Sequence, residues 1–200
     1  MSTPLSEASK RERNKAANRA AIIAAASEVF VEVGFGAANV RDIIRRTDLA
    51  SGTFYNYFPD KEAVFRAIVE ERADAILARV REARRAATDL PSFVASGFRA
   101  YFEAVSEDLV TLELMRRNAG TIRLLFDEAG IGTGLEDLRT DLRTAIAAGI
   151  LPEHDVDYMA AAMVGSAIEL SLRMVERDPP DVAGATGLAT DLFVAGLQRL

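Results

Sequence analysis

The residues best suited to chemistry lie in segment 51–58, which reads Ser-Gly-Thr-Phe-Tyr-Asn-Tyr-Phe. Its first three side chains are small or absent, so a helix formed here can bring its backbone close to a partner. Gly52 costs a helix about 1 kcal/mol relative to Ala, which indicates that close approach offsets this cost. Tyr55, Asn56 and Tyr57 then supply hydroxyl and amide groups that can hydrogen-bond to base edges and phosphates. The segment therefore predicts a surface that enters a DNA groove.

Most enzyme and metal chemistry is excluded by residue types that the chain lacks. It has no cysteine, which excludes disulfides, thiolate metal sites and a cysteine nucleophile. Its one histidine, His154, cannot make a multi-histidine zinc site, and no Glu-x-x-His pair is present for a di-iron bundle. We therefore predict no metal, no cofactor and no catalytic residue. Two alternatives remain: a helical enzyme, and a helical ligand- or protein-binding adaptor without specific DNA binding, which the acidic charge and Ala50 favour slightly.

Segment 51–58 needs supporting helices, and the residues before it predict two of them. The first helix runs from Lys15 to Val33, and Gly34 stops it because glycine accepts the left-handed conformation at low cost. Its apolar residues recur at the spacing of one helix face, at Ile22, Ala26, Val29, Phe30 and Val33.

The second supporting helix is short and begins at a predicted capping box. Asn39 can accept a hydrogen bond from the amide three residues on, and Asp42 can act as the acidic partner. The helix continues to about Arg46. Thr47-Asp48-Leu49 then forms a three-residue turn, in which Asp48 is tolerated in left-handed backbone better than most residues.

A further short helix follows the turn, from about Ala50 to Tyr57. Phe54 and Phe58, four residues apart, face inward and hold it. Three helices with a three-residue turn between the second and third make a helix-turn-helix. Asp60 then caps a long helix predicted over Lys61–Arg85.

The remainder of the chain predicts more helices and no strand. Breaks rich in Pro, Gly and Asp separate segments that carry helical patterns. These segments are 91–106, 109–126, 135–148, 156–176 and 182–200. The chain is 50% hydrophobic, which is ample for a core. We predict an all-α fold.

The charge is unevenly spread around a formal net value of −6. Residues 1–66 carry ten basic and eight acidic residues, whereas residues 67–200 carry fourteen and twenty-two. A mildly positive first third on an acidic remainder is typical of a DNA-reading head on an acidic body.

Residues 1–14 are polar and without periodicity, so they are predicted to form a flexible tail. The alternative is a basic arm that reaches DNA phosphates, made by Lys10, Arg11, Arg13 and Lys15. A signal peptide at the apolar run 20–26 is disfavoured, because the apolar positions continue at helical spacing to Val33. No stretch approaches the roughly eighteen apolar residues of a membrane span. We therefore expect a cytoplasmic protein.

Four motifs stand in register along the N-terminal third of the chain. They are Gly34-Phe35, Val40-Arg41-Asp42-Ile43, Gly52-Thr53-Phe54-Tyr55-Asn56-Tyr57-Phe58 and Lys61-Glu62. Together they resemble the signature of the tetracycline-repressor (TetR) family of transcription regulators, over residues 15 to about 66. The resemblance implies a helix-turn-helix DNA-binding domain at 15–66 and a helical effector-binding and dimerisation domain at 67–200, after the tail at 1–14.

The same resemblance implies which residues contact DNA. The helix over 50–57 would be the recognition helix. Ser51, Thr53 and Asn56 would face base edges, and Asn56 can make a bidentate contact with adenine. The tyrosines and the lysine would contact phosphates, and the two residues of the preceding helix would contact backbone or groove. The full set is Asn39, Arg41, Ser51, Gly52, Thr53, Tyr55, Asn56, Tyr57 and Lys61.

The sequence departs from the family pattern at three places. Thr47-Asp48-Leu49 stands where Ala-Gly-Val is frequent, and Asn39 and Ala50 stand where Ser or Thr is frequent. Asn39 can still cap a helix but Ala50 cannot, so one cap or phosphate hydroxyl is missing. These departures affect individual contacts and leave the fold intact.

For the residues after 66, the resemblance implies an effector pocket and a homodimer formed through the last two helices. A small, mainly apolar effector fits an apolar lining with one arginine for an anionic group, although methionines at helical spacing are more often core. The candidate lining residues are Phe98, Tyr101, Phe102, Leu112, Met115, Arg116, Phe126, Met159 and Met163. The function implied is a repressor that such a molecule releases from a palindromic operator.

Overall fold

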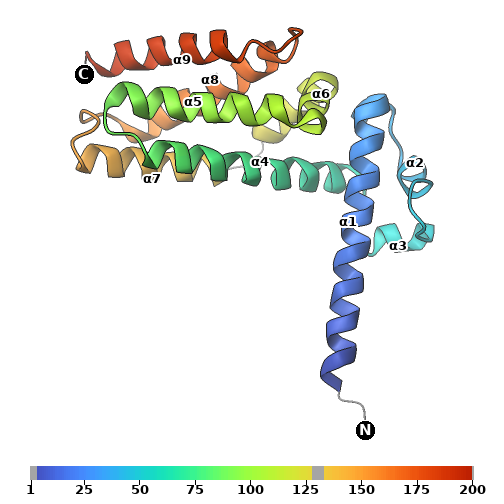
Figure 1. Ribbon diagram of the computed structural model, residues 1–200. Helices are drawn as coiled ribbons and strands as arrows, with labels where there is room; N and C mark the ends of the chain where they lie inside the picture. Colours follow the sequence, from blue (N-terminus) through green and yellow to red (C-terminus); the bar gives the residue numbers. More distant parts are fainter. Residues whose placement is uncertain (1–3, 128–132, 200) are drawn as a thin grey trace. The chain divides into compact units, whose positions relative to one another are not determined.

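The computed structural model describes residues 4–127 and 133–199. The chain divides into two compact units, Met1–Val69 and Glu70–Leu200, which we call the head and the body. Every regular element among the described residues is a helix, which confirms the all-α prediction (Figure 1).

Over its described residues, 4–69, the head contains three helices and the start of a fourth. They are α1 (Pro4–Ala37), α2 (Val40–Ile44), α3 (Ser51–Tyr55) and α4 (Lys61–Arg85), of which α4 continues into the body. The predicted stripe of α1 is buried from Ile22 to Phe30, while Val33 is 46% exposed. The ring of Phe30 meets that of Phe65 edge to face, 5.0 Å between centroids. This aromatic contact joins α1 to α4 in the core of the head.

The first helix begins earlier than the sequence pattern predicted. It starts at Pro4, so residues 4–14, expected as a flexible tail, are helical. Residues 10–17 are exposed, so packing does not hold this part of the helix. Its composition explains the difference, because Ala, Lys, Arg and Glu are strong helix formers and Pro suits a first helical position.

Glycine ends the regular part of α1 at the predicted place. Gly34 has φ 77° and ψ 161°, a backbone conformation that side chains rarely adopt, and the helix ends one turn later at Ala37. The segment Lys10–Ala37 is also long and apolar enough to cross a membrane by length and composition alone. We expected no such stretch, and the alanines between 16 and 26 account for it. Ile22, Ala26 and Phe30 are fully buried in the head, as in the core helix of a folded domain.

The body consists of the rest of α4 and five more helices among its described residues. These are α5 (Leu90–Glu107), α6 (Leu109–Asp127), α7 (Thr133–Ala147), α8 (Val156–Met174) and α9 (Val182–Leu197). Their bounds lie within three residues of the predicted segments. The most extensive packing in the body is between α5 and α9, followed by that of α7 on α8, and α8 also packs on α9. Phe98 stacks between Phe102 and Phe193 at centroid distances of 6.0 and 5.5 Å, which places an aromatic core between α5 and α9.

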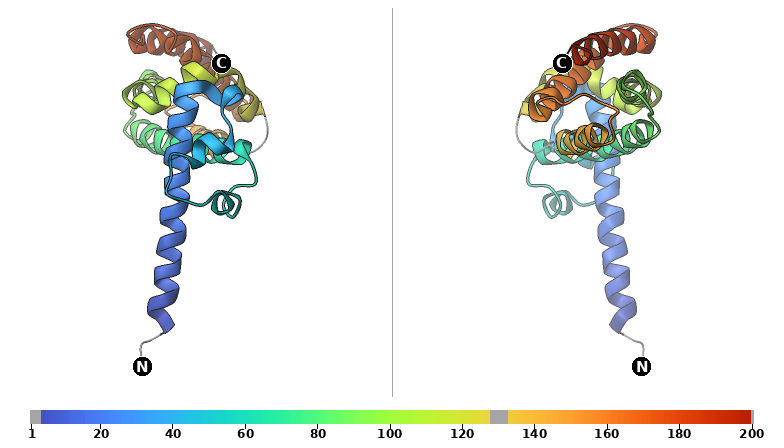
Figure 2. Two further views of the ribbon diagram at one scale, coloured as in Figure 1. Left: turned by 90° about the vertical axis from the view of Figure 1, so that its right-hand side faces the viewer. Right: turned by 90° about the vertical axis from the view of Figure 1, so that its left-hand side faces the viewer.

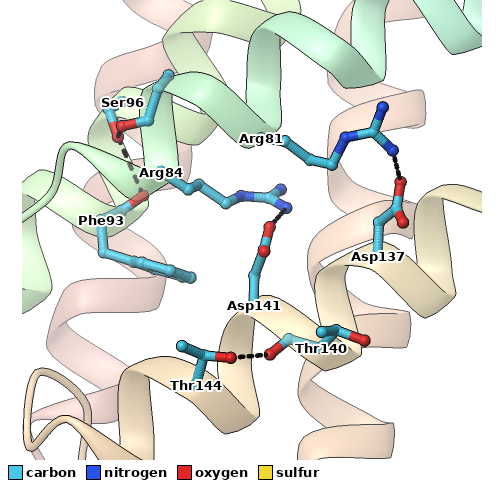
Figure 3. Close-up of polar contacts among 9 residues, drawn as sticks. Arg81, Arg84, Phe93, Ser96, Asp137, Thr140, Asp141 and Thr144 are labelled. Atoms are coloured by element: carbon cyan, nitrogen blue, oxygen red, sulfur yellow. Dashed lines mark hydrogen bonds and ion pairs between the residues drawn. The ribbon is translucent and has the colours of Figure 1, made fainter.

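An ion-paired row joins α4 to α7 inside the body (Figure 3). Arg84 is paired to Asp141 at 3.2 Å, and Arg81 is paired to Asp137 one turn earlier. The Arg84 side chain is only 13% exposed and that of Asp141 18%. Gly97 of α5 makes room for the arginine, because a Cβ at Gly97 would lie 2.8 Å from Arg84 Nε.

Candidate nucleic-acid interface

The helix α3 is held in place by two phenylalanines. Phe54 is fully buried and Phe58 is 5% exposed, as the four-residue spacing predicted. Their ring centroids lie 6.1 Å apart, and the guanidinium of Arg19 stands over the Phe58 ring at 5.6 Å. Because α3 is only five residues long, these contacts and the flanking turns fix its orientation.

The helix α2 begins with the predicted cap, in a modified form. Asn39 Oδ1 accepts a hydrogen bond from the Asp42 amide at 3.0 Å, which confirms the N-cap. The Asp42 carboxylate in turn accepts a hydrogen bond from the side-chain amide of Asn39. In an ordinary capping box this second hydrogen bond comes from the backbone amide of the cap residue. The Asn39 side chain has both a donor and an acceptor, so it takes part in both hydrogen bonds of this cap.

A threonine organises the turn between α2 and α3. Thr47 Oγ1 donates to the Ile44 carbonyl oxygen at 3.0 Å and accepts from the Leu49 amide at 3.3 Å. No non-glycine residue of the described chain has a positive φ, so the expected left-handed tolerance of Asp48 is not used. The turn is instead built by a hydroxyl that bonds its own backbone. Ala50 makes no side-chain cap, as predicted.

The predicted DNA-binding residues mostly lie on the exposed side of the head. Tyr55 is 61% exposed, although its ring meets Phe54 edge to face. The set divides by exposure: Asn39, Arg41, Ser51, Gly52, Tyr55 and Asn56 are exposed, and Thr53, Tyr57 and Lys61 are half-buried. A Cβ at Gly52 would meet nothing within 4 Å. The glycine therefore fills no packing need inside the chain, and the space beside it faces outward.

Lys61 has an internal role that its sequence position did not indicate. Its Nζ donates to the carbonyl oxygens of Phe35 and Ala38, at 2.9 and 3.0 Å, and lies 4.5 Å from the centroid of the Phe35 ring. These bonds satisfy carbonyls at the end of α1, which no helical amide can reach. An ammonium has three donors, so one remains for an outside acceptor. The predicted phosphate contact of Lys61 stays a prediction.

Arg46 anchors the end of α2 to α1. It is paired to Glu32 and, at 3.6 Å, to Glu28. The hydrogen bond from Glu32 raises the pKa of Arg46, against the opposing effect of desolvation. The signal that the sequence offered is the pair of glutamates four residues apart on one exposed face of α1.

The predicted pocket residues of the body are largely buried in its apolar interior. Phe98, Phe102, Leu112, Met115 and Met163 are all less than 9% exposed. Tyr101 and Met159 are half-buried, and Arg116 is exposed. The side chain of Phe126 lies outside the described residues. Arg116 therefore stands apart from the buried apolar members of the set. It donates to the carbonyl oxygens of Val175 and Arg177 at the end of α8.

A pair of hydroxyl groups interrupts this apolar interior. Tyr101 Oη lies 3.5 Å from Oγ of Ser171, which is fully buried and also donates to the Ile168 carbonyl oxygen at 2.8 Å. Burial raises the pKa of Tyr101, with a smaller opposing effect from Ser171. Tyr101 was predicted from the sequence but Ser171 was not, because a serine on a mainly apolar helix carries no distinct pattern.

The head as described matches a known family model. Residues 22–68 match the model of the bacterial regulatory proteins of the tetR family, from the buried stripe of α1 through the helix-turn-helix to the start of α4. The head of this chain is therefore a DNA-binding domain of the tetR family over residues 22–68.

Two curated relatives are named as helix-turn-helix regulators. The transcriptional activator FasR of Mycolicibacterium smegmatis is 29% identical over 100 residues, which are 50% of this chain and 46% of FasR. The transcriptional regulator UidR of Escherichia coli K12 is 32% identical over 97 residues, which are 48% of this chain and 50% of UidR. The chain thus spans about half the length of the curated relatives it matches.

The likeness of the fold extends over both units. FadR of Bacillus subtilis, solved in complex with stearoyl-CoA, superimposes with a TM-score of 0.68 at 25% identity. The match covers 88% of this chain and 97% of that FadR chain. The body therefore has the all-α C-terminal fold of tetR-family regulators, although no motif in its sequence indicated the family.

The last two helices of the chain each expose apolar and small residues. Tyr158 on α8 is 79% exposed, and Leu188 and Leu192 on α9 are 52% and 60% exposed. Ala161, Ala162 and Gly165 are also exposed. On the other side of α8, Met163, Leu172 and the adjoining Val175 are buried within the protomer. The exposed residues recur at helical spacing, so each helix has an outward apolar stripe.

Proposed function

We propose that the protein is a ligand-responsive transcription regulator of the cytoplasm, which represses genes by binding a palindromic operator. The observation that carries this proposal is the outward row formed by α3 and its C-cap residue Asn56. Ser51, Gly52 and Asn56 are exposed while Phe54 and Phe58 anchor the same short helix in the core. A helix held from behind, with small and amide-bearing residues in front, suits the major groove.

Each residue of the predicted DNA-binding set has a proposed role on DNA. Asn56 reads an adenine edge, with Ser51 and Thr53 beside it, and Gly52 lets the backbone approach. Tyr55 and Tyr57 bind phosphates, and Lys61 can donate its third N–H to another. Asn39 and Arg41, at the start of α2, contact the backbone or the adjacent groove. These roles follow the family resemblance and the exposure of the side chains.

The repressor is proposed to act as a homodimer through α8 and α9. The outward stripes on these helices hold three large apolar side chains, Tyr158, Leu188 and Leu192, and several residues small enough for close helix contact. A four-helix arrangement with a second copy would bury them. Two heads would then reach half-sites about 34–36 Å apart on an inverted repeat.

The proposed effector is a mainly apolar molecule bound within the effector domain predicted at 67–200. Its support is the apolar character of the predicted lining residues and the relative FadR, which was solved with stearoyl-CoA. A long-chain acyl-CoA is therefore the first molecule to test. Binding releases the operator if the liganded body favours a different spacing of the heads. Shifting that equilibrium from 1:99 to 99:1 needs about 5.5 kcal/mol of differential binding.

The test of DNA binding starts from the bound genome. Sequencing of DNA fragments that the protein retains should return an inverted repeat, and a footprint should cover both halves. Asn56→Ala should weaken operator binding by roughly 10- to 100-fold and relax the preference at one position of each half-site. Glu71→Ala, an exposed change in the body, is the control. A protein that retains no repeat and gives no footprint would rule out specific repression.

The effector is tested on the same operator. Stearoyl-CoA, added to the preformed complex, should release the duplex, whereas coenzyme A alone should not. Release by both compounds, or by neither, would contradict an apolar acyl effector and leave the DNA-binding result untouched.

A further inference from the structure

We propose that the exposed N-terminal part of α1 is a second DNA-binding element, a helical arm that binds phosphates beside the recognition helix. The inference rests on the proposed DNA-binding function and adds a surface to it. The arm is defined here as residues 10–19. It holds five basic residues and one acidic residue, and all but Asn18 are exposed.

The arm continues beyond the packed part of the head. Helix α1 extends past α2 and α3 toward its N-terminus (Figures 1 and 2). Its burial begins only at Ile22, where the side chains of α1 meet the core of the head. Residues 10–17 therefore add nothing to that core, and their helical form presents side chains at fixed angles.

Three of the basic side chains lie on one face of the arm. Arg11, Lys15 and Arg19 stand four residues apart, which places them in one row along about 12 Å of helix. The next positions of this row are Ile22 and Ala26, both fully buried. The basic row is therefore the outward continuation of the face of α1 that packs on the helix-turn-helix.

One contact places this row next to the recognition segment. The Arg19 guanidinium stands 5.6 Å from the centroid of Phe58, the residue that anchors the end of the recognition segment. Arg11 and Lys15 extend from that point on the same side of the helix. The other sides of the helix carry alanines at positions 16, 17, 20 and 21, together with Lys10 and Arg13.

Phosphates are the partner that fits this row. Duplex DNA carries about one negative charge per 1.7 Å of axis, and lysine and arginine that neutralise it release bound cations. Arginine also presents a fork of donors that matches a phosphate. Since the head as a whole is only mildly basic, a concentrated row beside α3 supplies attraction that the recognition helix lacks. These contacts are independent of base sequence.

The test compares two double variants of the full chain that lose the same charge. Arg11→Gln with Lys15→Gln removes two charges from the row, and Gln keeps the helix. Lys10→Gln with Arg13→Gln removes two from the same segment on other faces. Binding to the operator and to a scrambled duplex of equal composition is measured from 50 to 200 mM salt.

The row variant should lower the slope of log affinity against log salt by about 1.8 for each protomer bound, at about 0.9 per phosphate contact. The change should appear on both duplexes, and the control variant should stay near the wild type. Equal slopes for wild type and row variant, or equal losses in both variants, would overturn the arm. A wild type that binds both duplexes alike would instead overturn specific repression, while the slopes still decide the arm. Failure to bind either duplex would overturn both.

Discussion

The ammonium of Lys61 closes the end of α1, donating to the carbonyl oxygens of Phe35 and Ala38 at 2.9 and 3.0 Å. It also lies over the Phe35 ring at 4.5 Å. Lys61 is the first residue of α4, so this one side chain ties the end of the first helix to the start of the fourth. The lysine of the predicted DNA-binding set is thus a structural residue of the head.

Replacing Lys61 should therefore destabilise the head. Lys61→Met keeps the aliphatic stem but removes both hydrogen bonds and the charge over Phe35. We expect a loss of about 2 kcal/mol in the free energy of unfolding, because charge-assisted bonds are lost and two carbonyl groups lose their donor. Chemical denaturation measures this loss in the free energy of unfolding. Lys10→Met, at an exposed lysine, is the control and should change stability little. Similar values for both variants would contradict the structural role.

Gly52→Ala should move stability and DNA binding in opposite directions. A methyl group there meets nothing within 4 Å, and Ala is favoured over Gly in a helix by roughly 0.5–1 kcal/mol. The head should gain stability in a thermal melt. If the glycine allows the backbone to approach DNA, operator affinity should fall, by about tenfold or more. A more stable variant with unchanged operator affinity would show that Gly52 does not face the groove.

The Arg84–Asp141 pair should respond differently to single and double replacement. Asp141→Leu leaves a buried arginine without its partner, and such a loss costs about 3–5 kcal/mol. Burial already lowers the pKa of Arg84, and Asp141 only partly restores it. Combining Arg84→Met with Asp141→Leu should recover much of the loss, as measured by urea unfolding.

The exposed pair of Arg79 and Glu107 provides the comparison for that experiment. Their side chains are 46% and 60% exposed, so Glu107→Leu should change stability by less than about 1 kcal/mol. If the double variant Arg84→Met with Asp141→Leu is no more stable than Asp141→Leu alone, the loss does not come from an unpaired buried arginine.

Asp108 should make the stability of the body depend on acid pH. Desolvation raises the pKa of Asp108, but the hydrogen bond from Thr111, the charge of Arg72 and the amides of Val110 and Thr111 outweigh it, and the net pKa is lowered. A carboxyl group with a lowered folded-state pKa contributes stability above its unfolded pKa of about 3.9 and loses it as the pH falls through the folded value.

The measurement for Asp108 is the pH profile of unfolding. The stability difference between the wild type and Asp108→Asn should be constant near neutral pH and shrink below about pH 4. Glu153→Gln, at an exposed glutamate, serves as the matched control and should show little such change. A difference that persists unchanged to pH 2 would exclude this role for the carboxylate.

Much of the fold could be predicted because its signals are local. The cap at Asn39, the break at Gly34 and the inward spacing of Phe54 and Phe58 each depend on residues within a few positions of one another. The exposed start of α1 was mispredicted although it too is local. Hydrophobic periodicity is absent there, and only helix propensity indicates a helix.

Contacts between distant residues could not be predicted in the same way. Lys61 and Phe35 are 26 residues apart, and Arg84 and Asp141 are 57 apart. Any of the chain's 24 basic residues could pair with many of its 30 acidic ones, so charge alone selects no partner. Only the packing of helices brings a particular pair within hydrogen-bond distance and removes it from water.

The sequence by itself determined that the chain is helical, and its motifs indicated the tetR-family head with a short segment for DNA. This was possible because helix caps, helix breaks and hydrophobic periodicity depend on residues that are close together in the sequence. The tertiary structure decided that Lys61 closes α1 and that Gly52 faces open space. It also decided that Arg11 and Lys15 extend the face of α1 that packs on the helix-turn-helix. These facts depend on which surfaces meet when the helices bury their apolar faces, and no local pattern encodes that.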